Sequence, residues 1–585
     1  MSTPVASRSR ALAALLRPDA LRWTALGGLL ALSSALTLAG PLVVRAMVDR
    51  ATSGTDAAGL TRLAFVYLAI AVAAQAFAVV VVWFATITAW RTTNLLRMRM
   101  ARHVLGLDHE FHRRHTPGEL IQRVDGDVTS VSDFLGMVIP RAVSAALLVV
   151  GMVAALAVLD WRLAAGAAVY VVIAVVMVAS GRHRAVRESS EEMGSYARLY
   201  GGIEERLTAA EDLRANAAGH HAVWRFVQES ADAMATSVRR ERAFLTMWWG
   251  VQGSVAAGSV VGLVAGAALV AGGAITLGTA FLLFQYVLLL SRPLEDVVQQ
   301  LETVQKANGA MVRVIDLLAV KPDIVDHGTT SPPVGPLAID LDGVSFDYGD
   351  DELVLHRVDL HIAAGRSVGI IGRTGSGKTT LSRLVLRLVE ASNGTLALGG
   401  VPIAEIPLTE LRRRVALIPQ EVELLSGTIR DNVTLFDDIP TDDAVSDALR
   451  RAGLTALVDG GIHRILGPGG AGLSAGEAQL LALARVWLRK PDLVVLDEAT
   501  ARIDPVTESR LEAAVAELMA GRTTLIIAHR LSTLNKVDEI VVLDHGEVVE
   551  HGDRATLAAS DRSRFRHLLE LALDEATTRD EEVVP

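Results

Sequence analysis

The chain carries the stretch Gly372-Arg373-Thr374-Gly375-Ser376-Gly377-Lys378-Thr379 in its second half. The spacing is G-x-x-x-x-G-K-[ST], which is typical of a loop whose backbone N–H groups surround phosphates. In such a loop Lys378 reaches the β- and γ-phosphates, and the Thr379 hydroxyl is a ligand for Mg²⁺. We expect Thr380, the next residue, to belong to the same site.

The flanks of this stretch support the interpretation. Residues 367–371 have the pattern of a strand, and residues 381–388 that of a helix. The alternative is a glycine-rich turn that carries a lysine by chance, but the order strand, loop, helix favours the phosphate loop. The second half is therefore predicted to be an α/β domain that binds a nucleoside triphosphate.

A second apolar run, residues 493–496, ends in the carboxylates Asp497 and Glu498. Continuous apolar runs are typical of buried parallel strands, and open α/β sheets bind ligands at the carboxyl ends of such strands. We expect Asp497 to hold Mg²⁺ and Glu498 to polarise the attacking water as a general base. The alternative, a pair of acids at a helix N-terminus, is disfavoured by the phosphate loop. Tyr348, which follows a strand-like stretch, is predicted to stack on adenine.

Composition separates the two halves of the 585-residue chain. Hydrophobic residues make up 51% and the mean hydropathy is +0.37, too apolar for a purely soluble protein. The chain has no cysteine, which excludes disulfides, thiolate metal sites and cysteine nucleophiles. Its net charge of −10 provides no electrostatic footprint for nucleic acid.

The first half contains uncharged stretches long enough to cross a bilayer, which needs about 20 apolar residues. They lie at residues 23–44, 63–90, 142–159, 163–181 and 243–291. The last is too long for one helix, and Gly272-Gly273 is predicted to divide it, which gives six transmembrane helices. The alternative, a set of buried core helices, is disfavoured by the number and length of these charge-free runs.

Two of the connections, residues 91–133 and 182–242, are long and rich in arginine. By the positive-inside rule they are cytoplasmic, as are both termini and the second half of the chain, which predicts a multi-pass protein of the cytoplasmic (inner) membrane. Their apolar periodicity predicts helices that continue into the cytosol. We expect each to turn, around residues 106–117 and 208–221, through a short helix that presses on a soluble domain.

The predicted fold is thus a multi-domain membrane protein. An all-α, six-helix transmembrane domain over residues 1–319 is followed by a linker at residues 320–336, which contains proline and glycine. The α/β P-loop NTPase domain then covers residues 337–585.

In this order and spacing the motifs resemble those of ATP-binding cassette (ABC) transporters of the exporter type, with one membrane domain fused to one nucleotide-binding domain. The resemblance extends over nearly the whole chain and implies ATP and Mg²⁺ as cofactors. Gln420 matches the glutamine that couples Mg²⁺ and the γ-phosphate to the membrane domain, and His529 the histidine that contacts the γ-phosphate. Further nucleotide contacts are implied for the signature motif and the D-loop, at Ser474, Gly476, Glu477 and Asp504.

The resemblance also implies a dimer, because the signature motif of one cassette faces the ATP held by another. Ala475 and Glu477 stand where this family usually has Gly and Gln, and Pro468 stands where exporters often have Glu. The phosphate loop, Asp497 and Glu498 are intact. This division favours a heterodimer with a second half-transporter over a homodimer, because heterodimeric exporters commonly divide their two sites in this way.

The transported substrate is less well determined. The spans contain few polar side chains, and the candidates for cargo contact are Gln75, Gln252, Gln285, Trp248, Trp249 and Tyr286. For each one singly, helix packing or interfacial anchoring is the favoured alternative. A weakly polar pathway suits a hydrophobic or amphipathic small molecule, lipid or peptide, and the direction of transport stays open. Other readings are an ATPase subunit with a regulatory or assembly role and a soluble P-loop kinase; the six spans and the signature motif disfavour the kinase.

Overall fold

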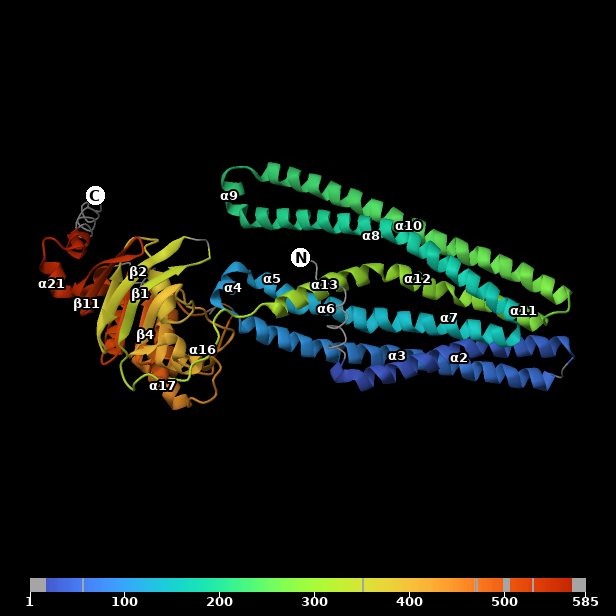
Figure 1. Cartoon of the computed structure of the whole chain (residues 1–585), viewed down its shortest axis with the longest axis horizontal. Helices are drawn as coiled ribbons and strands as arrows, with labels where there is room; N and C mark the ends of the chain where they lie inside the picture. Colours follow the sequence, from blue (N-terminus) through green and yellow to red (C-terminus); the bar gives the residue numbers. More distant parts are fainter. Residues whose placement is uncertain are drawn as a thin grey trace. The chain divides into compact units, whose positions relative to one another are not determined.

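The computed structural model describes residues 17–54, 57–349, 352–467, 469, 472–497, 505–528 and 531–570. The chain forms two compact units, which are described separately (Figure 1). The helical unit holds residues up to Leu107 and His115–Lys321, and the cassette unit holds Asp108–Arg114 and Pro322–Pro585. A short segment from the first half of the chain thus belongs to the cassette unit.

The helical unit contains the six predicted membrane spans. The spans lie in helices or helical runs that cover Arg17–Thr52, Ala57–Leu105, Pro117–Leu159, Trp161–Thr208, Gly219–Ala271 and Leu277–Asp296. Their elements are η1 (Arg17–Asp19), α2 (Ala20–Thr52), α3 (Ala57–Leu105), α5 (Pro117–Ile121), η2 (Gln122–Gly126), α6 (Asp127–Asp133), η3 (Phe134–Val138), α7 (Ile139–Leu159), α8 (Trp161–Thr208), α10 (Gly219–Ala271), α11 (Leu277–Leu289) and α12 (Ser291–Gln299). α9 (Ala210–Ala215) and α13 (Leu301–Ala319) complete the unit.

Three of these helices are far longer than a bilayer is thick. α3, α8 and α10 have 49, 48 and 53 residues, which at 1.5 Å per residue gives about 70–80 Å, against a hydrocarbon core of about 30 Å. The prediction that the membrane helices continue beyond the membrane is therefore confirmed. The predicted breaks are present as well: Asp160 separates α7 from α8 and accepts a hydrogen bond from the Arg162 N–H at 2.7 Å, and α10 ends before Gly272.

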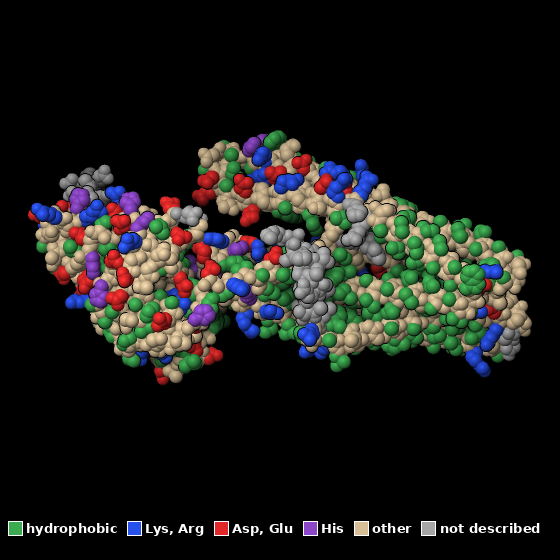
Figure 2. All heavy atoms as spheres, viewed as in Figure 1, with side chains coloured by type: hydrophobic (Ala, Val, Ile, Leu, Met, Phe, Trp, Pro, Cys, Tyr) green, Lys and Arg blue, Asp and Glu red, His purple; other side chains and the backbone are tan. Residues whose placement is uncertain are grey.

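The spans leave much of their apolar surface uncovered. Val79, Val82 and Trp83 on α3 are 62%, 66% and 63% exposed. In water such an apolar surface would promote aggregation, whereas lipid solvates it without cost. Figure 2 shows hydrophobic side chains over the face of this unit in view, with charged side chains gathered toward the ends of the helices. This pattern fits helices that are surrounded by lipid.

The cassette unit is an α/β domain with two main sheets. The first has the order β2-β1-β4-β5 and the second the order β12-β11-β3-β10-β9-β6, with a small β7-β8 pair beside them. Their bounds are β1 (Ile339–Asp347), β2 (Leu353–Ile362), β3 (Ser367–Ile371), β4 (Asn393–Leu398), β5 (Val401–Pro402), β6 (Val415–Ile418), β7 (Gly427–Thr428), β8 (Ile465–Leu466), β9 (Leu493–Asp497), β10 (Thr523–Ile527), β11 (Glu539–Asp544) and β12 (Glu547–Asp553).

The helices of this unit include α4 (His109–Arg114), the short helix expected at the first turning point. The others are α14 (Lys378–Val385), η4 (Ile403–Glu405), α15 (Leu408–Arg414), α16 (Ile429–Thr434), α17 (Asp442–Arg451), α18 (Thr455–Asp459), α19 (Ala475–Arg489), α20 (Pro505–Met519), η6 (Leu531–Lys536) and α21 (Arg554–Ala559). The helix expected at the second turning point is α9, in the helical unit.

The larger sheet positions the site. β6, β9, β10, β3 and β11 run parallel, so the loops after β3, β6 and β9 leave the sheet at the same edge. β3 is buried along its whole length, as its continuous apolar sequence predicts. The helix after the phosphate loop differs from expectation: it was predicted at residues 381–388 but begins at Lys378 and ends at Val385. It starts earlier because the loop lysine is itself the first helical residue, directly after the left-handed Gly377.

Candidate functional site: a phosphate loop and a capped signature helix

The phosphate loop joins β3 to α14, and its backbone needs glycine. Gly377 has φ +100° and is the N-cap of α14; a Cβ on it would lie 2.6 Å from Leu355 Cδ2. Gly375 has φ +83°, and no atom lies within 4 Å of the place where its Cβ would be. The loop is therefore tight against the protein at Gly377 and open at Gly375, which gives a ligand close access to the backbone.

The polar side chains of the loop fit a polyphosphate. Lys378 is 5% exposed, and its Nζ donates to the carbonyl oxygens of Gly372 at 2.8 Å and Arg373 at 2.9 Å. Ser376 Oγ is buried and has no hydrogen-bond partner within the described residues. A buried hydroxyl without a partner is rare, and a phosphate oxygen would supply one. Arg373, Thr374 and Thr379 are exposed, on the accessible side of the loop.

Tyr348 lies beside α14 and is held there by its hydroxyl group. That hydroxyl is 3.1 Å from Thr380 Oγ1 and accepts a hydrogen bond from Arg383 Nη1 at 2.9 Å. The predicted binding residue Thr380 is thus 5% exposed and engaged with Tyr348. The Phe346 ring meets the Tyr348 ring edge-on, with centroids 4.8 Å apart. These contacts fix the aromatic ring next to the phosphate loop.

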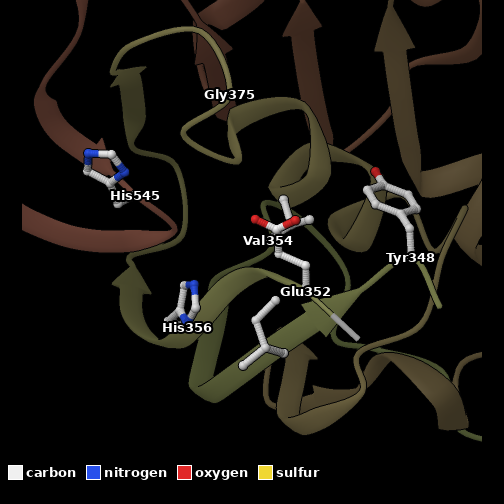
Figure 3. Close-up of a pocket in the computed structure, with 7 residues that line it drawn as sticks. Tyr348, Glu352, Val354, His356, Gly375 and His545 are labelled. Atoms are coloured by element: carbon white, nitrogen blue, oxygen red, sulfur yellow. The ribbon is translucent and has the colours of Figure 1, made fainter. Parts of the chain in front are cut away.

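A cavity of about 300 Å³ connects Tyr348 with Gly375 of the loop. Figure 3 shows Tyr348 on one side of it and His356 and His545 on the other, with the Gly375 loop nearby. Five lining residues were not predicted from the sequence: Glu352, Leu353, Val354, His356 and His545. They come from the start of β2 and from the turn between β11 and β12, and no motif marks either segment.

Asp497 and Gln420 lie where the sheet order brings them together. Asp497 ends β9, and Gln420 follows β6, the parallel neighbour of β9. The Gln420 carbonyl oxygen accepts a hydrogen bond from Gln479 Nε2 of α19 at 2.6 Å, so this segment is tied to the signature helix. The described residues contain no cluster of three or more His, Cys, Asp or Glu side chains for a metal.

Several predicted residues lie outside the described part of the chain, namely Glu498, Asp504 and His529. Their roles remain predictions. Asp497 ends β9, and Ala528 directly follows β10, its parallel neighbour; these described residues precede Glu498 and His529.

The signature segment begins α19 with a capping box. Ser474 is the N-cap; its Oγ accepts from the Glu477 N–H at 3.2 Å, and Glu477 Oε2 accepts from the Ser474 N–H at 2.9 Å. Ser474 and Ala475 are exposed, whereas Gly476 is buried. Glu477 therefore has a local structural role in addition to the predicted nucleotide contact, and its carboxylate lies at the helix N-terminus.

Comparison with known families now identifies the chain. The family described as "ABC transporter transmembrane region" matches residues 23–294, and that described as "ABC transporter" matches residues 355–501. An ATP-dependent lipid A-core flippase of Chromobacterium violaceum is 31% identical over 80% of this chain and 81% of its own length. The chain is an ABC transporter. The ABC transporter is a multi-pass membrane protein and an ATPase that couples hydrolysis to transport.

Other relatives show how broad the family is. The glutathione/L-cysteine transport system ATP-binding/permease protein CydC of Escherichia coli is 29% identical over 80% of the ABC transporter and 82% of its own length. The structure of a bacterial Atm1-family ABC exporter with ATP bound matches with a TM-score of 0.79 at 23% identity, over 93% of this chain and 96% of that one. This match confirms the predicted fold of a six-span membrane domain followed by a cassette.

Proposed function

We propose that this ABC transporter is one half of a dimeric exporter that moves a hydrophobic or amphipathic solute, with ATP and Mg²⁺ bound at the edge of the larger sheet. The observation that carries the proposal is the juxtaposition of the phosphate loop with the ends of β6 and β9 at that edge. Residues 1–319 form the membrane domain, residues 320–336 the linker and residues 337–585 the cassette. The cassette and both termini face the cytoplasm of the inner membrane.

Within the cassette, each residue takes a separate part in phosphoryl transfer. Lys378 and the loop N–H groups bind the phosphates, and Tyr348 stacks on adenine. Thr379, Gln420 and Asp497 hold Mg²⁺, which supplies charge stabilisation for the phosphates. Glu498 orients and deprotonates the attacking water, and His529 contacts the γ-phosphate. Because the nucleophile is water and the leaving group is ADP, catalysis consists of positioning and charge stabilisation.

A dimer is needed to complete the site. The N-terminus of α19 carries Ser474 and Ala475 at the surface of the cassette, where its N–H groups and dipole favour an anion. We propose that it meets the ATP on a second cassette, and that Asp504 contacts nucleotide as well. The negative charge of Glu477 weakens the contact between the N-terminus of α19 and this ATP. This supports a heterodimer whose partner subunit carries the more usual signature motif. A homodimer that hydrolyses ATP at full rate would contradict this choice.

The helical unit supports an apolar cargo. A cavity of about 400 Å³ lies among α8, α10 and α11, with an apolar lining that includes Leu163, Val261 and Leu283. Tyr286 is fully buried and donates to the Leu38 carbonyl oxygen at 3.2 Å, so its role is packing rather than cargo contact. Trp249, by contrast, is 65% exposed and can touch lipid or cargo. The relative from Chromobacterium violaceum is named a lipid A-core flippase, which supports a lipid cargo for this chain.

The test is transport by the purified protein in vesicles. Vesicles would carry either a fluorescent phospholipid or a water-soluble dye, with and without ATP, and the chain would be reconstituted alone and with a candidate partner. We expect ATP-dependent movement of the lipid probe and none of the soluble dye. ATP hydrolysis without movement of any apolar probe would instead favour a regulatory ATPase.

The base is tested separately with Glu498→Gln. This change should leave ATP binding intact and slow hydrolysis about 10²–10⁴-fold, the usual contribution of a positioned base. The matched control is Glu405→Gln, which alters an exposed acid on η4 and should not change the rate. Hydrolysis at the same rate in both variants would remove Glu498 from the mechanism.

A further inference from the structure

The short helix α4 contacts the cassette at the residue proposed to stack on adenine. The Arg113 guanidinium lies over the Tyr348 ring, 5.3 Å from its centroid. The neighbouring Arg114 donates from Nη2 to the Tyr348 carbonyl oxygen at 3.2 Å. Asp108, just before α4, accepts hydrogen bonds from the N–H groups of Asp323 and Ile324. A segment from the first half of the chain therefore contacts Tyr348, one of the residues that line the cavity beside the phosphate loop.

Arg113 is held in a fixed orientation by Glu110. Its Nε and Nη2 donate to the two carboxylate oxygens of Glu110 at 2.8 and 2.7 Å. Arg114 Nε also donates to Glu110, at 2.8 Å. A bidentate pair of this kind fixes the plane of the guanidinium group as well as its position. Arg113 therefore presents a defined, planar cation to the ring.

Tyr348 is consequently held from two directions. Its hydroxyl is bound to Thr380 and Arg383 of α14, the helix that begins in the phosphate loop. Its ring is bound to Arg113 of α4. A guanidinium within about 6 Å of a ring centroid is attracted by the ring quadrupole. A ring that is already fixed loses less conformational freedom when a base stacks on it.

We propose that Arg113 is a positioning residue for the adenine base, which it serves by orienting Tyr348. This inference rests on the proposed stacking role of Tyr348. Adenine binding and the packing of α4 against the cassette then both depend on the Tyr348 side chain. Each therefore increases the equilibrium constant of the other by the same factor. ATP bound at the phosphate loop thereby stabilises the contact between α4 and the cassette.

The proposal predicts an effect on the base alone and none on the phosphates. We would measure the affinity of the full-length protein for ATP and for inorganic triphosphate, both in EDTA so that no hydrolysis occurs. Arg113→Met should weaken ATP binding about three- to fivefold and leave triphosphate binding unchanged. Arg113→Lys, which keeps a cation above the ring, should restore most of the ATP affinity. A merely structural loss would weaken both ligands or neither.

Two further variants distinguish the role of Arg113 from the stacking role of Tyr348 itself. Arg114→Met removes a contact with the Tyr348 backbone and not with its ring, so the ratio of ATP to triphosphate affinity should stay unchanged. Tyr348→Leu should lower that ratio. If Tyr348→Leu lowers the ratio but Arg113→Met does not, the role of Arg113 is overturned while the stacking role stands. If Tyr348→Leu leaves the ratio unchanged, the proposed stacking role fails, and the inference fails with it.

The reciprocal effect is measured by limited trypsin digestion. ATP in EDTA should slow cleavage after Arg113 and Arg114, and inorganic triphosphate should not. In Arg113→Met the remaining cleavage after Arg114 should no longer respond to ATP. Equal protection by both ligands would overturn the link between the base and α4.

Discussion

Two helices of the cassette begin at positions proposed to face phosphate, and their N-termini are built differently. α14 begins at Lys378 after the left-handed Gly377, which has no side chain to cap the helix. α19 begins after Ser474, whose capping box with Glu477 uses two backbone N–H groups. Helix N-termini attract anions through their dipole and their unpaired N–H groups. The difference is that the N-terminus of α14 has no side-chain cap, whereas part of the N-terminus of α19 is satisfied by its own capping box.

The contrast extends to charge. α14 carries a buried lysine at its first position, and α19 carries a carboxylate in its first turn. A carboxylate there stabilises the helix through the dipole but repels an approaching phosphate. One helix end is thus suited to hold ATP tightly, and the other to be stable at the surface and to meet ATP only when a second cassette presents it.

Lys378→Ala tests the α14 side and should have the largest effect in this series. The variant loses the charged hydrogen bonds between Lys378 and the phosphates, which are worth about 1.5–3 kcal/mol. The ATP affinity measured by titration calorimetry should therefore fall at least tenfold. Lys536→Ala removes an exposed lysine of η6 and should not change the affinity. Retained ATP affinity in Lys378→Ala would mean that the loop lysine is not a phosphate ligand.

Ser474→Ala tests the α19 side. Loss of an N-cap costs about 1 kcal/mol, which should lower the thermal midpoint of the cassette by a few degrees in a nucleotide-free melting experiment. ATP binding to the same chain should stay normal, because α14 provides that site. Steady-state hydrolysis should fall, because the partner cassette loses a contact to its ATP. A fall in binding affinity as large as the fall in hydrolysis would contradict the division between the two helices.

Glu477→Gln sharpens the comparison by removing charge alone. Glutamine can also form a capping box, so stability should change little. Hydrolysis should rise about two- to fivefold, which corresponds to the worth of one charge near a helix terminus. The measurement is the ATPase rate at saturating ATP, beside the melting temperature. An unchanged or lower rate would show that this carboxylate does not limit turnover and would remove the main argument for a heterodimer.

Much of this arrangement could be predicted from sequence, because it depends on local patterns. The spacing of the phosphate loop and the continuous apolar run of β9 predict strand ends at one sheet edge, and the charge-free stretches predict the spans. The capping box is also visible in the sequence, since Ser474 and Glu477 have the S-x-x-E spacing of that motif. The family pattern alone predicts only a nucleotide contact at Glu477.

The remainder depends on contacts between distant segments. His356 on β2 and His545 in the turn between β11 and β12 reach the cavity from separate segments, and no local pattern marks them. Arg113 lies over Tyr348 although the whole linker and the last four spans separate them in sequence. Arginines are frequent in that link, and nothing in the pattern distinguishes Arg113 from its neighbours. Only the tertiary fold selects it.

The smallest expected effect concerns pH and the α4 contact beside α14. Hydrogen bonds from Arg113 and then Arg114 lower the pKa of Glu110 from its usual 4.5 to about 2. A carboxyl whose pKa falls on folding stabilises the folded state fully above its unfolded pKa and loses that contribution as the pH falls toward the folded pKa.

The titrating groups near Glu110 include His109, whose pKa is lowered by burial and by Arg383. The His109 imidazole is therefore neutral at pH 7. Docking of α4 should therefore be constant above about pH 7, weaken as the pH falls below the unfolded His109 pKa of 6.5, and weaken further between pH 4.5 and 2 as Glu110 is protonated, as measured by hydrogen exchange in α4. Glu110→Gln should raise exchange at pH 7 and converge on the parent protein as the pH approaches 2, because protonation removes the same charge. A difference between the two proteins that persisted undiminished down to pH 2 would show that Glu110 acts through its shape and not through its charge.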